Sequence, residues 1–120
     1  MTTTTKEVCF LIGADGEVLW SDASTTPFAL PDSRARWEAI WSRREALVEI
    51  AHSHPLGPLG FSEEDRTTML ALRSALGKAV RFSVVAPDGV ILDDGQTQAL
   101  VSPEPVWASQ LRISSGMSPG

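Results

Sequence analysis

Short apolar runs separated by turn residues recur along the chain. Residues 8–12 are apolar and partly β-branched, Asp15 and Gly16 follow, and residues 18–20 are apolar again, which predicts two strands joined by a tight turn. Similar runs predict further strands at residues 47–54, 80–86, 90–92 and 99–101. Pro55 cannot donate to a strand ladder, so the strand before it should end near His54.

Two other segments carry apolar residues at helical spacing. The first has Trp37, Ile40, Trp41 and Arg44 at positions i, i+3, i+4 and i+7, and Asp32 or Ser33 before it supplies a helix start. The two tryptophans at this spacing are expected in the core rather than on a binding surface. The second helix is predicted over about residues 63–76, between Ser62 and Gly77.

The order of these elements predicts the fold class. Strand pairs alternate with two separated helices, which favours an α+β layered domain with a mixed central sheet and two main helices. A chain of 120 residues, 42% of them apolar, is long enough for one core. We expect the domain to cover residues 1–108 and residues 109–120 to form a flexible C-terminal tail, because residues 114–120 are small, polar and rich in Gly and Pro.

Charge and cysteine content narrow the function classes. The net charge of −5 is a poor match to nucleic acid, whose binding depends on cationic contacts to phosphates. Cys9 is the single cysteine and cannot form an internal disulfide, so any metal site must use histidines and carboxylates. The apolar run at residues 8–12 is too short for a signal-peptide core or a membrane span, which predicts a cytoplasmic protein without a membrane partner. The sequence indicates no oligomeric state.

Both histidines of the chain lie in the tetrapeptide His52-Ser53-His54-Pro55. On a strand, residues i and i+2 point to the same face, so the two imidazoles can meet one ion. Asp65 belongs to the first turn of the following helix, where the helix dipole favours an ionised carboxylate. Two histidines and one aspartate with a fourth position left open are the kind of site that catalytic Zn²⁺ uses.

The spacing of these residues resembles a known family. His-Ser-His-Pro, followed after a fixed gap by Ser62-x-x-Asp65, looks like the JAMM motif of the JAB/MPN zinc metalloproteases, and the resemblance extends from about Glu7 to Leu92. It implies an MPN/JAB-like, cytidine-deaminase-like layered fold in a small bacterial-type member. It also implies a zinc hydrolase in which His52, His54 and Asp65 hold the metal. Glu7 would be the general acid/base, and Ser62 would donate to the oxyanion.

The resemblance also implies a substrate class. Family members cleave after the C-terminal Gly-Gly of ubiquitin or a ubiquitin-like protein, which makes such proteins or their conjugates the expected partners. Three alternatives stay open: maturation of a ubiquitin-like sulfur carrier, a metal-free MPN scaffold that only binds partners, and a RadC-type JAB protein linked to DNA metabolism. The net charge and the lack of a basic stripe count against the last of these.

Each candidate residue also has a simpler structural explanation. Ser62 and Asp65 fit a helix capping box, which need not conflict with a role in catalysis. A glutamate before a buried strand is usually only solvated, and Glu49, Glu63 and Glu64 compete with Glu7 for the role of base.

Overall fold

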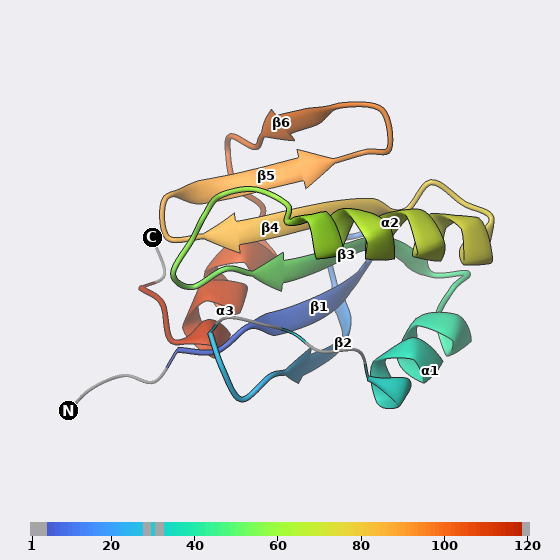
Figure 1. Ribbon diagram of the computed structural model, residues 1–120, viewed down its shortest axis with the longest axis horizontal. Helices are drawn as coiled ribbons and strands as arrows, with labels where there is room; N and C mark the ends of the chain where they lie inside the picture. Colours follow the sequence, from blue (N-terminus) through green and yellow to red (C-terminus); the bar gives the residue numbers. More distant parts are fainter. Residues whose placement is uncertain (1–4, 28–29, 31–32, 119–120) are drawn as a thin grey trace.

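A six-stranded sheet with the strand order β2-β1-β3-β4-β5-β6 forms the centre of the molecule (Figure 1). The computed structural model describes residues 5–27, 30 and 33–118. The strands are β1 (Val8–Gly13), β2 (Val18–Ala23), β3 (Leu47–Ser53), β4 (Arg81–Ala86), β5 (Gly89–Asp93) and β6 (Gln98–Leu100). The helices are α1 (Arg34–Ser42), α2 (Glu63–Leu76) and α3 (Val106–Ser115).

The sheet is mixed, as the order of the elements predicts. Strands β3 and β4 are parallel, and every other neighbouring pair is antiparallel. A parallel pair needs a crossover connection, and α2 supplies it between β3 and β4. This crossover brings the first turn of α2 back toward the end of β3 (Figure 1).

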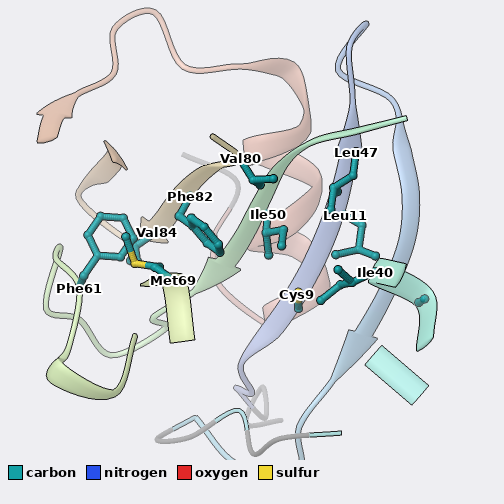
Figure 2. Packing of buried hydrophobic residues seen from close by; sticks show 11 residues of the cluster. Cys9, Leu11, Ile40, Leu47, Ile50, Phe61, Met69, Val80, Phe82 and Val84 are labelled. Carbon is teal, nitrogen blue, oxygen red and sulfur yellow. The ribbon is translucent and has the colours of Figure 1, made fainter. Parts of the chain in front are cut away.

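Helices α1 and α2 cover one face of the sheet (Figure 1), and Figure 2 shows the apolar side chains of the core on that face. Cys9, Leu11 and Ile50 from β1 and β3 pack in this core with Ile40 of α1 and Met69 of α2. Helix α2 starts and ends where the sequence predicts, because Ser62 caps its first turn and Gly77 ends it with φ +63°.

Helix α3 covers the opposite face and joins the two main helices that the sequence predicts. The expectation of a flexible tail from residue 109 is wrong, because residues 109–115 belong to this helix. Trp107, Ala108 and Leu111 are buried against the apolar side chains that β1, β3 and β4 present on that face. The spacing of these three residues is helical, but the small polar residues that follow them led to the prediction of a flexible tail. The domain therefore extends through α3, and Met117 also packs on this second core.

The predicted helix is present as α1, but its two tryptophans are not buried as expected. Ser33 is its N-cap, and the Ser33 side chain accepts a hydrogen bond from the Arg36 N–H. Asp32, the alternative cap, lies outside the described residues. Trp37 is 42% exposed and Trp41 is 44% exposed, so the expectation that they belong to the core is wrong. Helix α1 packs on the sheet through Ala39 and Ile40 instead.

Among the described residues, none of the helices has the length and apolar character needed to cross a membrane.

Candidate metal centre

Strand β3 delivers both histidines to the same side of the sheet. His52 is the last residue but one of β3 and His54 directly follows the strand, and their Nε2 atoms are 3.1 Å from each other. Ser53 lies between them and points to the other side, where its Oγ accepts a hydrogen bond from the Val8 N–H at 2.9 Å. Ser53 is fully buried, and its hydrogen bond fixes the position of the histidine pair relative to the beginning of β1.

Glu7 immediately precedes β1 and reaches the same site. Cys9 pairs with His52 in the antiparallel ladder, and continuing this register by two residues places Glu7 opposite His54. The Glu7 backbone is held on its other edge, where its N–H donates to the Thr26 carbonyl and its carbonyl accepts from the Ser24 N–H. Glu7, His52 and His54 offer ligand atoms that all lie within 4.8 Å of one another.

Asp65 completes the cluster from the first turn of α2. Its Oδ1 lies 3.3 Å from His52 Nε2, and its Oδ2 lies 3.5 Å from His54 Nε2. The same carboxylate accepts a hydrogen bond from the Ser62 N–H at 2.8 Å, and Ser62 Oγ accepts one from the Asp65 N–H at 3.0 Å. The capping box is therefore present, and it orients Asp65 toward the histidines.

The separations among His52, His54 and Asp65 fit a tetrahedral metal site. Ligand atoms 2.0–2.1 Å from a tetrahedral Zn²⁺ are about 3.3 Å apart. The two Nε2 atoms are close to this separation, and each of them has one of the two Asp65 oxygens at a similar distance. His54 Nδ1 lies 3.0 Å from the Pro58 carbonyl oxygen. Because that oxygen can only accept, Nδ1 carries the proton and leaves the Nε2 lone pair of neutral His54 for a metal.

The electrostatics of the cluster are set by burial and by the short contacts. Burial by itself would raise the pKa of Asp65, but hydrogen bonds from His52 and His54 outweigh it and lower that pKa far below its usual range. Burial would likewise lower the pKa of His54, but the hydrogen bonds to Asp65 and Pro58 dominate and raise it. Asp65 is therefore an ionised carboxylate, the form that a metal needs.

Glu7 behaves differently, because burial dominates and raises its pKa, although His52 and His54 partly oppose the rise. A carboxylate with a raised pKa beside two candidate metal ligands is suited to accept and return a proton. The two carboxylates of the cluster thus have opposite pKa shifts, which separates a candidate ligand, Asp65, from a candidate base, Glu7.

A cleft of about 600 Å³ opens from this cluster between α1 and α2. Glu7, His52, Ser62 and Asp65 line the cleft together with apolar side chains from both helices and the sheet. The apolar lining residues are Leu30, Ile40, Ile50, Met69, Leu72 and Phe82. The cluster is therefore open to a ligand while most of its side chains stay partly buried.

The rival carboxylates do not take the place of Glu7. Glu49 is buried, accepts a hydrogen bond from the Ser83 hydroxyl and lies 3.6 Å from Arg81 Nε. Glu63 and Glu64 line the cleft from α2 but do not belong to the group of Glu7, His52 and His54, whose ligand atoms lie within 4.8 Å of one another.

Two supporting groups escaped the sequence analysis. Strand alternation places Ser53 opposite the histidines, but its hydrogen bond to Val8 depends on the pairing of β1 with β3. The Pro58 carbonyl lies near His54 because the chain turns at Gly57, whose φ of +74° favours glycine.

Comparison with known proteins gives the family of this chain. A search of curated proteins finds no relative. The model of a protein family described as prokaryotic homologs of the JAB domain matches residues 3–92. This match covers β1 to β5 apart from the last residue of β5, and it includes Glu7, both histidines, Ser62 and Asp65. The chain therefore belongs to the prokaryotic homologs of the JAB domain.

Proposed function

We propose that this protein is a zinc-dependent peptidase or isopeptidase that cleaves after the C-terminal Gly-Gly of a ubiquitin-like protein. The observation that carries the proposal is the meeting of His52, His54 and Asp65 at the separations of a tetrahedral site, with buried Glu7 beside the two histidines. Family membership supports a JAMM-type hydrolase. The ubiquitin-like substrate follows from the resemblance of the motif.

Each residue of the site has its own role in the proposed reaction. Zn²⁺, held by His52, His54 and Asp65, would polarise the scissile carbonyl and activate water. Glu7 takes a proton from the attacking water and returns it to the leaving amine, and its raised pKa favours both transfers. The Ser62 hydroxyl lines the cleft and donates to the oxygen that becomes negative as the carbonyl is attacked.

The cleft supports an extended tail as substrate. Apolar side chains of α1, α2 and β4 line it, together with the candidate metal ligands His52 and Asp65. Glycine lets a substrate backbone approach the site closely because it lacks a Cβ atom. A Gly-Gly sequence at the scissile bond therefore suits the site, and the residues before it would lie along the apolar part of the cleft.

Zinc stoichiometry is the first test. The purified protein is reconstituted with Zn²⁺, desalted and assayed for metal, next to His52→Ala/His54→Ala and a Glu45→Gln control that leaves the site intact. We expect one zinc per chain in the wild type and in the control, and none in the double variant. Equal zinc in all three proteins, or none in any, would contradict the proposed site.

Cleavage of a panel of ubiquitin-like substrates tests the reaction. Linear fusions and isopeptide conjugates are incubated with the zinc-loaded protein. Cleavage of both types supports deconjugation, whereas cleavage of the linear fusion alone favours the alternative, maturation of a sulfur-carrier protein. A zinc-loaded protein that cleaves neither type would leave the non-catalytic scaffold as the better interpretation.

A further inference from the structure

Helix α1 carries a solvent-exposed aromatic stripe that the metal centre does not use. The rings of Trp37 and Trp41 stack with their centroids 6.1 Å apart, and the Arg44 guanidinium lies 4.2 Å from the centre of the Trp41 ring. Both tryptophans keep more than two fifths of their surface exposed. Tryptophan and arginine are the residues most enriched in binding hot spots, whereas solitary exposed leucines are common on any surface.

This stripe, made of Trp37, Trp41 and Arg44, borders the cleft. Arg36 and Ile40 of the same helix line the cleft, while Ala39 packs on the sheet. Successive side chains of an α-helix are rotated by about 100° around the helix axis. Trp37 and Trp41 are therefore rotated by about 100° from Arg36 and Ile40, on the side away from Ala39. A protein whose tail occupies the cleft would therefore meet the stripe with its folded body.

The positive charge around the stripe indicates which kind of partner surface can bind there. Residues 34–44 contain four arginines and one glutamate, although the whole chain has a net charge of −5. Arg36 is paired with Asp22, and Arg34 is paired with Glu38, so Arg43 and Arg44 extend the positive character toward the end of the helix. Opposite charge across an interface speeds encounter and fixes orientation, which favours a partner with an acidic surface.

We propose that the stripe of Trp37, Trp41 and Arg44 docks the folded body of the substrate protein through an acidic and apolar patch on that body. The proposal rests on the proposed function, because it assigns the occupant of the stripe from its position beside the cleft. The cleft selects the tail, and the stripe selects which protein carries that tail. Most of the substrate affinity then comes from a surface outside the metal centre.

Two substrates separate docking from chemistry. The first is the fusion of the panel that the wild type cleaves fastest, and the second is a synthetic peptide with the last six residues of its tail and the same leaving group. Trp37→Ala/Trp41→Ala is compared with Leu70→Ala, an apolar residue on α2 that is 70% exposed and does not line the cleft. We expect the double tryptophan variant to raise KM for the fusion at least about tenfold, with kcat and peptide cleavage unchanged.

Further outcomes decide the proposal. Leu70→Ala should leave both KM values unchanged, and Arg44→Glu should raise KM only for the fusion. An unchanged KM for the fusion in the tryptophan variant, or equal losses on fusion and peptide, would overturn the proposal. A wild-type dimer in sedimentation that the tryptophan variant dissociates would also overturn it, because a second copy would then occupy the stripe.

A failure of the proposed function can be told apart from a failure of docking. If the wild type cleaves no fusion, each uncleaved fusion of the panel is titrated against the wild type and the tryptophan variant by calorimetry. Binding that the variant loses would support docking although the proposed reaction fails. Absence of binding by every fusion would overturn docking as well.

Discussion

At the scale of single residues, the site depends on two carboxylates in different surroundings. Asp65 lies against both imidazoles and is held ionised, whereas burial dominates at Glu7 and raises its pKa. Their positions follow from different elements, since Asp65 lies in the first turn of α2 and Glu7 directly precedes the central strand β1. The same functional group is thus suited to be a ligand in one place and a base in the other.

Replacing the base should separate catalysis from metal binding. In Glu7→Gln we expect kcat on the fusion to fall by about 10²–10⁴-fold, because general base catalysis contributes that much, while one zinc per chain is retained. The comparison is Glu45→Gln, an exposed residue outside the cleft. Loss of zinc together with activity would instead make Glu7 a ligand.

At the scale of elements, the start of α2 combines helix capping with a candidate catalytic hydroxyl. Ser62 Oγ accepts from the Asp65 N–H, and its own proton is available to a ligand in the cleft. Loss of a serine cap to alanine costs about 1 kcal/mol of stability, whereas glycine at the same place costs only a few tenths. The two replacements therefore affect stability differently while both remove the hydroxyl.

Ser62→Gly and Ser62→Ala should accordingly differ in stability but agree in activity. We expect both to lower kcat by about 10²–10³-fold, as the removal of an oxyanion donor does, with little change of KM for the peptide. Urea unfolding should show only the alanine variant to be clearly less stable. Wild-type kcat in Ser62→Gly would reduce Ser62 to a helix cap.

Helix α3 is attached by an ion pair whose strength depends on pH. Arg112 is buried, donates to the Ala86 carbonyl and pairs with Glu104 through contacts of 2.5 and 2.9 Å. The hydrogen bond from Arg112 lowers the pKa of Glu104 below its ordinary value of 4.5. A lowered folded pKa means that this carboxylate stabilises the fold above pH 4.5 and that the contribution is lost as the pH falls through the folded pKa.

We therefore expect Glu104→Gln to lower the free energy of unfolding by about 1 kcal/mol at pH 7. The difference from the wild type should shrink progressively below about pH 4.5. Urea unfolding at a series of pH values measures both quantities. A difference that grows on acidification would contradict the assigned role of the pair.

At the scale of the whole molecule, the sheet needs helices on both faces. Helices α1 and α2 build the cleft, and α3 covers the other side, where Leu111 is completely buried. Without α3, the apolar side chains of β1, β3 and β4 on that face would contact water. The helix that lies far from the cleft is therefore needed to hold the strands that carry Glu7 and the histidines.

Truncation tests this requirement. The chain 1–108 ends inside α3 and lacks Leu111 and Arg112, and we expect it to lose cooperative thermal unfolding, since removal of one buried leucine side chain alone costs about 2–5 kcal/mol. The chain 1–118 keeps α3 and Met117 and should unfold like the full chain. Circular dichroism follows both transitions, and a cooperative 1–108 would contradict the role given to α3.

The sequence by itself determined most of the local structure and the identity of the candidate ligands. Strand alternation puts His52 and His54 on one face, and the cap at Ser62 starts the helix that carries Asp65. Both are encoded within a few residues, because backbone period and helix capping are local properties. The α+β class follows in the same way from the order of the elements.

Only the tertiary structure decided which helix covers each apolar face and which residues distant in the sequence reach the site. Trp37 and Trp41 have the same helical spacing as core residues, but α1 meets the sheet through Ala39 and Ile40 and leaves them in solvent. The hydrogen bond from Val8 to Ser53 and the approach of Glu7 to His54 depend on the register of β1 with β3. The periodicity of a sequence indicates that one face of a helix or strand is apolar. Whether that face is buried depends on a second element, distant in the sequence, that packs against it.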